Sequence, residues 1–245
     1  MDNAVALVTG GTGGIGTAVC RELEQQGFKV VAGCRDLDKG RVWQRAQREA
    51  GHDIELVALD VSDYESCFHA YISTEEVHGP VQVLVNAAGI TRDKVLKKMT
   101  PDLWQQVIDT NLTGTFNMCR IAASCMAERG YGRIINISSV NGRKGQFGQV
   151  NYAASKAGIH GITMSLAQEL ARKGVTVNTL SPGYVMTEMV AKVPAEVLES
   201  ITRQIPVGRL GTPEEIAHSV AFLAGRRSGF ITGSDLSANG GMHMY

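Results

Sequence analysis

The feature that most constrains the fold is a glycine-rich turn between an apolar segment and an amphipathic segment near the N-terminus. Residues 4–9 (AVALVT) predict a short buried strand, GGTGGIG follows from Gly10 to Gly16, and TAVCRELEQQG predicts a helix. Glycines let the backbone turn tightly and approach a ligand closely, while a helix N-terminus presents free N–H groups and a positive dipole end. Strand, turn and helix in this order predict a pyrophosphate site at the start of a βαβ unit.

Apolar and helical segments alternate along the whole chain of 245 residues. Strands separated by helices imply right-handed crossovers and a parallel sheet. We therefore expect one α/β domain, a Rossmann-like, doubly wound parallel sheet of seven strands with helices on both faces. Strands are expected at 4–9, 29–33, 54–58, 81–86, 133–138, 175–180 and near 234–238. Helices are expected at 15–26, 39–50, 64–77, 101–129, 151–173, 195–204 and 213–224.

A second pattern places Tyr152 and Lys156 four residues apart in NYAASKAG, with Ser139 thirteen residues before the tyrosine. On a helix these two positions share a face, and an ammonium beside a phenol favours the phenolate, which predicts a lowered tyrosine pKa. Such a tyrosine is a usable general acid toward a carbonyl oxygen, or a base toward an alcohol. Ser139 ends the apolar run RIINIS and can hydrogen-bond the same oxygen. Taken alone, a tyrosine and a lysine at this spacing also fit an ordinary solvated helix face.

Several separated motifs together resemble the short-chain dehydrogenase/reductase family. They occur in the family's order along the whole chain: T-G-x3-G-x-G at Thr9, Gly10, Gly14 and Gly16, N-A-A-G at 86–89, Asn111, Ser139, and Tyr152 with Lys156. Within the family, NISSVNGRKGQFGQVNYAASKAG and NAAGITRDKVLKKMT are most similar to the 3-oxoacyl-thioester reductases. These include the acetoacetyl-CoA reductases of polyhydroxyalkanoate synthesis and, as near relatives, the 3-oxoacyl-[acyl-carrier-protein] reductases of fatty acid synthesis.

The resemblance implies a nicotinamide dinucleotide and a set of residues that contact it. They are Gly10, Thr12, Gly13, Gly14, Ile15, Gly16, Arg35, Asp60, Val61, Asn86, Ala87, Ala88, Gly89, Tyr152, Lys156, Pro182, Gly183, Val185 and Thr187.

The end of the second strand, KVVAGCRD, bears on the choice between NAD and NADP. Cys34 occupies the position where NAD-dependent relatives tend to have aspartate, and the guanidinium of Arg35 can bind a 2′-phosphate. Lys39 and Arg41 could add positive charge, whereas Asp36 could neutralise Arg35 instead. We predict NADP(H).

The same resemblance implies catalytic roles for Asn111, Ser139, Tyr152 and Lys156, with a kink in helix 101–129 at Asn111. It also implies a mobile lid at about 183–210. Residues that border the expected substrate site are Asp93, Lys98, Ser139, Gln146, Phe147, Gln149 and Tyr184.

The expected reaction is NADPH-dependent reduction of a 3-oxoacyl thioester, preferably acetoacetyl-CoA, to the (R)-3-hydroxyacyl thioester. Reduction of an acyl-carrier-protein thioester is the alternative, and a nucleotide-sensing protein without catalysis is a more remote one. Arg129, Arg172 and Lys173 could meet the acidic groups of a carrier protein or simply face solvent. The family also implies a homotetramer.

Composition limits the partners and the location that we expect. The 24 basic and 24 acidic residues leave no basic excess for nucleic acid, and the six histidines lack the spacing of metal ligands, so neither nucleic acid nor a metal is predicted. No segment resembles a signal peptide or a membrane span. The five cysteines have no C-x-x-C spacing, and buried free thiols are their expected state. A cytoplasmic location is therefore predicted.

Overall fold

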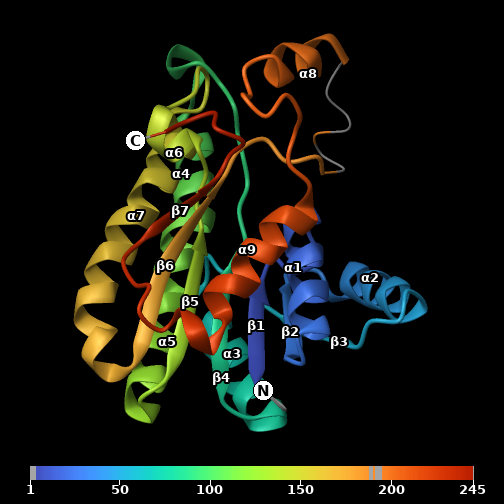
Figure 1. Ribbon diagram of the computed structural model, residues 1–245, viewed down its shortest axis with the longest axis vertical. Coiled ribbons are helices and arrows are strands. Elements are labelled where there is room, and N and C mark those ends of the chain that lie inside the picture. Colours follow the sequence, from blue (N-terminus) through green and yellow to red (C-terminus); the bar gives the residue numbers. More distant parts are fainter. Residues whose placement is uncertain (1–3, 188–189, 191–194, 245) are drawn as a thin grey trace.

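A seven-stranded parallel sheet forms the centre of the computed structural model, which describes residues 4–187, 190 and 195–244 (Figure 1). The strands run in the order β3-β2-β1-β4-β5-β6-β7, and every neighbouring pair is parallel. Their bounds are β1 Val5–Thr9, β2 Lys29–Cys34, β3 Ile54–Ala58, β4 Val81–Asn86, β5 Gly132–Ile137, β6 Val175–Pro182 and β7 Asp235–Ala238. The predicted fold and the seven predicted strands are confirmed.

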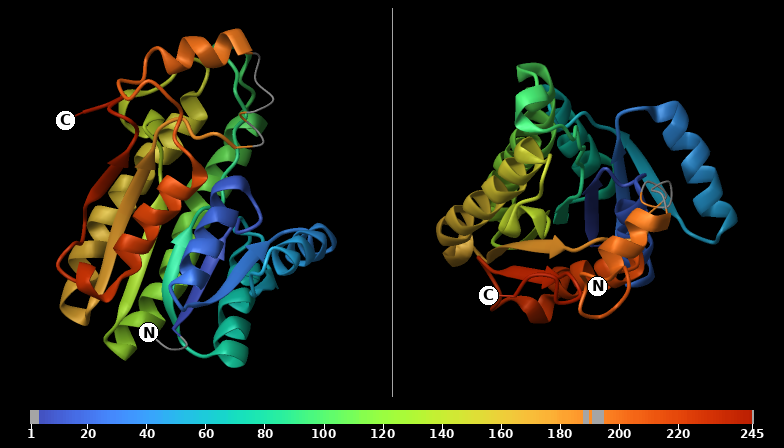
Figure 2. Two further views of the ribbon diagram at one scale, coloured as in Figure 1. Left: turned by 45° about the vertical axis from the view of Figure 1, so that its right-hand side comes forward. Right: turned by 90° about the horizontal axis from the view of Figure 1, so that it is seen from above.

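Helices cover both faces of the sheet, as the view from above in Figure 2 shows. Their bounds are α1 Gly14–Gln25, α2 Leu37–Glu49, α3 Tyr64–His78, α4 Pro101–Ile108, α5 Gly114–Arg129, α6 Asn141–Lys144, α7 Val150–Leu170, α8 Ala195–Thr202 and α9 Pro213–Ala224. Alternate residues of each strand point to opposite faces, so β1 sends Ala6 and Val8 into a core with α1 and α9, and Val5 and Leu7 into a second core with α3, α5 and α7. Within the described part of the chain, no helix combines the length and apolarity needed to cross a membrane.

The ends of the helices follow the local signals in the sequence. Thr100 and Thr212 accept hydrogen bonds from the first turns of α4 and α9, each followed by proline, as expected of N-caps. Gly130, at the end of α5, has a φ of 71°, the left-handed conformation that favours glycine.

The predicted helix 101–129 is interrupted at Asn111, where the family resemblance implied a kink. The segment 101–129 is divided into α4, a π-helical turn at Asp109–Thr113, and α5. A π-turn inserts an extra residue into the helical ladder and is frequent at functional sites. The short helix α6, directly after Ser139, was not predicted.

The strand order reverses between β1 and β4, since β1 pairs with β2 on one side and with β4 on the other. In open parallel sheets, ligands bind at the carboxyl ends of the strands beside such a reversal. The glycine turn after β1, residues 87–89 after β4 and the Ser138–Ser139 pair after β5 all lie at these carboxyl ends. The fold therefore brings the sequence motifs to one edge of the sheet.

Candidate active site

A cavity of about 1020 Å³ lies at the carboxyl edge of the sheet. It is lined by the glycine turn, by the segments that follow β2, β4, β5 and β6, and by the start of α7. Among the predicted site residues, those that line it are Gly10, Thr12, Gly13, Gly14, Ile15, Gly16, Arg35, Val61, Ala87, Ala88, Gly89, Ser139, Gln149, Tyr152, Lys156, Pro182, Gly183, Tyr184, Val185 and Thr187.

The glycine turn is folded so tightly that a side chain at several of its positions would meet neighbouring protein atoms. A Cβ on Gly16 would collide with the carbonyl oxygen of Gly10, and one on Gly14 would lie 3.0 Å from the side chain of Thr187. Helix α1 begins after Gly13 without a side-chain cap, so its first N–H groups stay available to an anion. Uncapped donors beside a cradle of glycines fit the pyrophosphate of a dinucleotide.

Thr9, at the end of β1, holds the neighbouring strand end in place. Its Oγ1 accepts hydrogen bonds from the backbone N–H groups of Ala87 and Ala88, each at 3.1 Å. This contact fixes the close approach of the segment after β4 to the glycine turn. The sequence shows Thr9 only as part of the glycine motif and does not predict these hydrogen bonds.

Two residues predicted to contact the cofactor lie outside the lining of the cavity. Asn86 is buried and donates from Nδ2 to Asn136 Oδ1 at 2.8 Å, which links β4 to β5. The carboxylate of Asp60 accepts from the N–H and hydroxyl of Ser62, at 3.0 and 2.6 Å. Their side chains organise the protein here, and contact with a dinucleotide stays a prediction for both.

Arg35 lines the cavity and is exposed. The nearby Asp36 does not neutralise it, because its carboxylate caps α2 by accepting from the N–H of Lys39 and pairs with Lys39 Nζ, both at 3.1 Å. Arg41 is likewise paired, with Asp38 at 3.0 Å. Within residues 4–187, 190 and 195–244, Arg35 makes no ion pair and so presents an unneutralised guanidinium to the cavity.

Three of the four predicted catalytic side chains, those of Ser139, Tyr152 and Lys156, meet in the cavity. Ser139 and Tyr152 are joined by a side-chain hydrogen bond, and Ser139 Oγ also accepts from the N–H of Asn141 at 3.1 Å. Lys156 is 4% exposed; its Nζ donates to the carbonyl of Ile137 at 2.7 Å and lies 5.7 Å from the centre of the Tyr152 ring.

The protonation of this group differs from the sequence prediction. Burial raises the pKa of Tyr152, side-chain hydrogen bonding with Ser139 lowers it in part, and the charges of Asp93 and Tyr184 raise it further. Lys156 does not offset this shift, and burial lowers the lysine's own pKa to about 8. The predicted lowering of the Tyr152 pKa is therefore wrong, because the sequence does not show how deeply the phenol and the ammonium are buried.

Asn111 lies in the π-helical turn and anchors the loop that follows β4. Its Oδ1 accepts from the N–H of Ile90 at 2.8 Å, and its Nδ2 donates to the carbonyl of Ile90 at 3.0 Å and to Ser155 Oγ at 3.1 Å. A Cβ on Gly89 would lie 3.4 Å from Asn111 Oδ1 and 3.5 Å from Lys156 Nζ. The predicted irregularity at Asn111 is confirmed, and it places the asparagine, like Lys156, next to Gly89.

The residues expected to border the substrate divide into two groups. Tyr184 and Gln149 line the cavity. Lys98, Gln146 and Phe147 do not line the cavity. Lys98 is the last residue of a short 3-10 helix, Gln146 accepts a hydrogen bond from Lys144 at 3.0 Å, and the side chain of Phe147 is 87% exposed.

A chain of side-chain hydrogen bonds connects the two loops that border the substrate side. Gln149 Nε2 donates to Asp93 Oδ2 at 2.8 Å, and Asn141 Nδ2 donates to Gln149 Oε1 at 2.9 Å. Asn141 is buried and lines the cavity, yet it was not predicted. Its position two residues after Ser139 was the available signal.

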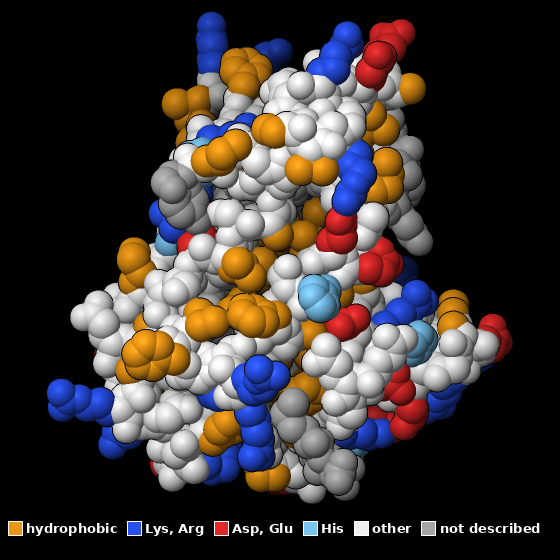
Figure 3. Space-filling view, in the orientation of Figure 1, with side chains coloured by type: hydrophobic (Ala, Val, Ile, Leu, Met, Phe, Trp, Pro, Cys, Tyr) orange, Lys and Arg blue, Asp and Glu red, His pale blue; other side chains and the backbone are white. Residues whose placement is uncertain are grey.

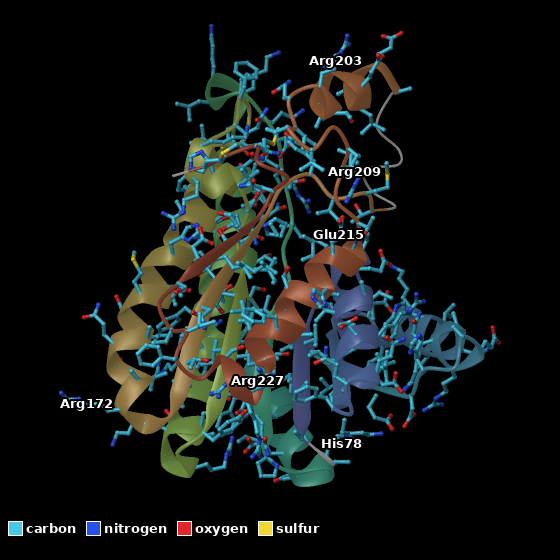
Figure 4. The ribbon with its side chains drawn as sticks, in the orientation of Figure 1. His78, Arg172, Arg203, Arg209, Glu215 and Arg227 are labelled. Carbon is cyan, nitrogen blue, oxygen red and sulfur yellow. The ribbon has the colours of Figure 1, made fainter. Side chains whose placement is uncertain are left out.

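The two ends of the segment expected to form a lid are joined by a backbone bridge. Val185 and Gly211 form a parallel bridge, with hydrogen bonds of 2.8 and 2.9 Å between the two segments. Arg209 and Glu215 lie side by side at the start of α9, joined by bonds of 2.8 and 2.6 Å (Figure 4). Residues 188–189 and 191–194 of the expected lid lie outside the described residues.

Comparison with known proteins agrees with this geometry. The family model described as short chain dehydrogenase matches residues 4–197. The chain is 54% identical over 245 residues to an acetoacetyl-CoA reductase of Cupriavidus necator, with 100% of both chains covered. It is 55% identical over 240 residues to an acetoacetyl-CoA reductase of Rhizobium meliloti, covering 98% of each. A 3-oxoacyl-[acyl-carrier-protein] reductase FabG of Vibrio cholerae is 42% identical over 244 residues, covering 100% of this chain and 99% of that protein.

The glycine turn, the Ser139–Tyr152–Lys156 group and these matches agree over most of the chain. The chain belongs to the short-chain dehydrogenase/reductase family and is an oxidoreductase that acts on CH–OH groups.

Proposed function

We propose that this protein reduces a 3-oxoacyl thioester, with acetoacetyl-CoA preferred, to the (R)-3-hydroxyacyl thioester at the expense of NADPH. The main support is that Ser139, Tyr152 and Lys156 converge in the same cavity that the glycine turn lines. Full-length relatives named acetoacetyl-CoA reductase, at 54% and 55% identity, support the substrate class.

The choice of NADP(H) rests on Arg35. A 2′-phosphate needs a cation that is not already paired, and Asp36 and Asp38 are occupied with Lys39 and Arg41. Gly10, Gly13, Gly14 and Gly16 would hold the pyrophosphate, and Pro182, Gly183, Val185 and Thr187 would hold the nicotinamide end. We expect Arg35→Asp to lower kcat/KM for NADPH much more than for NADH, and an unchanged ratio would contradict the assignment.

The side chains can manage the proton of a ketone reduction. The chemistry that NADPH supplies when bound is hydride donation to the carbonyl carbon. Because burial raises its pKa, Tyr152 keeps its proton at neutral pH and can donate it to the ketone oxygen. Ser139 accepts from the N–H of Asn141, so its own hydroxyl proton remains available to the same oxygen. Lys156, held against Ile137, would orient the ribose hydroxyls and supply positive charge.

The positions of Tyr152 and Ser139 bear on stereochemistry. Both hydroxyls must reach the ketone oxygen, which fixes that oxygen and leaves one face of the ketone open to the nicotinamide. Family resemblance gives the (R) alcohol as the product of that arrangement.

The basic residues that could meet an acidic carrier protein do not form a surface for it, which favours coenzyme A as the carrier of the acyl group. Arg129 is engaged within the subunit, paired with Glu75 at 2.8 Å and donating to the carbonyl of Val81 at 3.0 Å. Arg172 and Lys173 are exposed and lie in the 3-10 turn Ala171–Lys173 that follows α7, at the end of that helix remote from α8 (Figure 4). The face shown in Figure 3 carries basic and acidic side chains side by side. None of these features presents a continuous basic surface to an acidic carrier.

A spectrophotometric assay separates this function from the alternative of a catalytically inactive sensor. Purified protein with NADPH and acetoacetyl-CoA should oxidise NADPH with turnover, and chiral analysis should give (R)-3-hydroxybutyryl-CoA. Binding of NADPH without turnover would favour the sensor, and an (S) product would contradict the stereochemical assignment.

We also propose a homotetramer in the cytoplasm. Phe116 on α5 and Met164 on α7 are 48% and 50% exposed, and Met244 near the C-terminus is 75% exposed. A closed two-fold assembly, the commonest symmetry of homo-oligomers, would cover such exposed apolar side chains. Light scattering should give about four times the chain mass of 26.3 kDa, and a monomer at micromolar concentration would contradict it. All five cysteines are free, as expected in a reducing compartment.

A further inference from the structure

A buried polar bridge ties the end of β5 to the helix that bears Tyr152 and Lys156. His160 lies one turn after Lys156 on α7, and its Nε2 is 3.1 Å from Ser138 Oγ. Ser138 Oγ in turn donates to the carbonyl of Lys156 at 2.8 Å. His160 and Ser138 are 5% and 3% exposed, and Ser138 directly precedes Ser139. The bridge therefore joins the backbone of the catalytic serine to the helix of its two partners.

Counting protons fixes the state of this bridge. Ser138 has one hydroxyl proton, and the carbonyl of Lys156 receives it, so Ser138 Oγ can only accept from His160. The Nε2 atom of His160 must then carry the proton, and in a neutral ring Nδ1 is bare. Among the described residues Nδ1 has no hydrogen-bond partner and faces Asp235 Oδ2 at 3.6 Å. Two acceptors that face each other explain why this contact is longer than a hydrogen bond.

The charged groups around His160 come from three elements. Asp235 lies on β7, Arg143 on α6 and Lys156 on α7. Burial lowers the pKa of His160; Asp235 raises it, Arg143 and Lys156 lower it, and the net shift is downward. The ring is therefore neutral at pH 7.

The carboxylate of Asp235 already accepts hydrogen bonds from β6 and α6. Its Oδ1 accepts from Ser181 Oγ at 2.7 Å, and its Oδ2 accepts from Arg143 Nε at 3.0 Å. A proton on Nδ1 would turn His160 into a cation that competes with Arg143 for Oδ2. Arg143 belongs to α6, whose first residue, Asn141, donates its N–H to Ser139 Oγ.

We propose that neutral His160 is a positioning residue, which holds Ser138, and through it Ser139, in place against Tyr152 and Lys156. Protonation at acidic pH draws the ring toward Asp235, weakens the tether of α6 and lowers kcat. His160 touches neither substrate nor cofactor in this account. The kinetic part rests on the proposed function, since it needs a turnover assay with acetoacetyl-CoA.

Substitutions on both sides of the bridge test the positioning role. His160→Leu and Ser138→Ala should each lower kcat about tenfold, the loss of one aligned hydrogen bond, with KM for both substrates within about twofold of wild type. The double variant should lose no more than Ser138→Ala alone, because that substitution already removes both hydrogen bonds of the bridge. Additive losses, or a kcat within twofold of wild type in His160→Leu, would overturn the proposal.

Thr163→Val provides a matched control on the same helix. Thr163 is as buried as His160 and bonds to Asn136 Nδ2 at 3.0 Å and to Thr179 Oγ1 at 2.8 Å, with no link to Ser138. It should lose stability while keeping kcat. If its kcat fell as far as that of His160→Leu, general loosening of α7 would be the cause and the proposal would fail.

The pH profile separates positioning from packing. Wild-type kcat should decline on the acid side with a pKa below the ordinary histidine value of about 6.5. His160→Gln keeps an amide donor for Ser138 but cannot titrate, so that decline should disappear. Asp235→Asn should move the decline to lower pH, because the carboxylate raises the pKa of His160. The same acid decline in His160→Gln would overturn the proposal.

A spectroscopic measurement tests the ring without turnover. In protein carrying 15N-labelled histidine, the His160 signals are identified by their loss in His160→Gln. They should report a neutral ring protonated on Nε2 at pH 7. A charged ring or an Nδ1-protonated ring at that pH would overturn this inference. Failure of the wild type to reduce acetoacetyl-CoA would overturn the proposed function and leave this ring state to be judged by its own signals.

Discussion

The cavity has two sides that are built differently. The proposed cofactor side consists of the glycine turn and residues 87–89, where backbone atoms and small residues line the cavity. The substrate side consists of loops 90–98 and 141–149, which bind each other through Gln149 and Asp93 and through the N–H of Lys94 and the carbonyl of Gly148. A side built from backbone is visible in local sequence as glycine spacing. A side built from paired side chains depends on partners that only the tertiary structure selects.

The largest effect is expected at Tyr152, where the two sides meet. Tyr152→Phe removes the proton donor and keeps the ring, so kcat should fall by about 10²–10⁴. NADPH affinity, measured by fluorescence titration, and the melting temperature should stay near those of the wild type. Turnover close to wild type would show that another group supplies the proton.

Lys156 provides a test of how strongly the catalytic centre is desolvated. Its pKa is about 8 in the folded protein and about 10.5 in the unfolded chain, so the buried ammonium costs up to about 3 kcal/mol of stability below pH 8. That cost disappears as pH rises from 8 to 10.5. Lys156→Met should therefore be more stable than wild type at pH 7, and the difference should shrink by pH 9.5. Urea unfolding at both pH values measures it, and a pH-independent difference would contradict the buried charge.

Alanine substitutions at two glycines of the turn should differ in their effect on NADPH affinity. Gly16→Ala forces a Cβ onto the carbonyl oxygen of Gly10, whereas a Cβ on Gly13 would lie 3.3 Å from that same oxygen. We expect about a tenfold or greater loss of NADPH affinity for Gly16→Ala. Gly13→Ala, the matched control in the same turn, should lose less. The reverse order, measured by titration calorimetry, would show that the turn does not control the space for the pyrophosphate.

The smallest effect is expected from a substitution at Asp93, on the substrate side, and it concerns the pH dependence of kcat/KM. Its charge raises the pKa of Tyr152, so Asp93→Asn should lower that pKa. Reduction needs the protonated phenol, and the alkaline decline of kcat/KM should therefore move to lower pH. Gln149→Leu removes the hydrogen bond from Gln149 Nε2 to Asp93 but keeps the charge of Asp93, and it should not move the decline in that direction. A shift of equal size in both variants would mean that loop position is responsible, rather than charge.

Local sequence signals predict much of the framework. The seven strands, the threonine caps of α4 and α9 and the glycine end of α5 depend on neighbouring residues, and the structure has them as expected. The motif residues Ser139, Tyr152 and Lys156 also meet as predicted. Their positions follow from strand ends and helix periodicity, which the sequence shows directly.

The misses depend on tertiary contacts. Burial reverses the expected pKa shift of Tyr152, and the partners of Asn141 lie on separate loops. Phe147, a bulky residue in the right loop, points to solvent, with 87% of its surface exposed. In each case the deciding neighbour is chosen by the fold.

The central claim is that this chain reduces short 3-oxoacyl groups carried by coenzyme A. The most direct test is kcat/KM with NADPH for acetoacetyl-CoA and for acetoacetyl-carrier protein, measured on one preparation. The account predicts turnover of both and a preference for the CoA thioester. A preference for the carrier protein of tenfold or more, about 1.4 kcal/mol of transition-state binding, would contradict it.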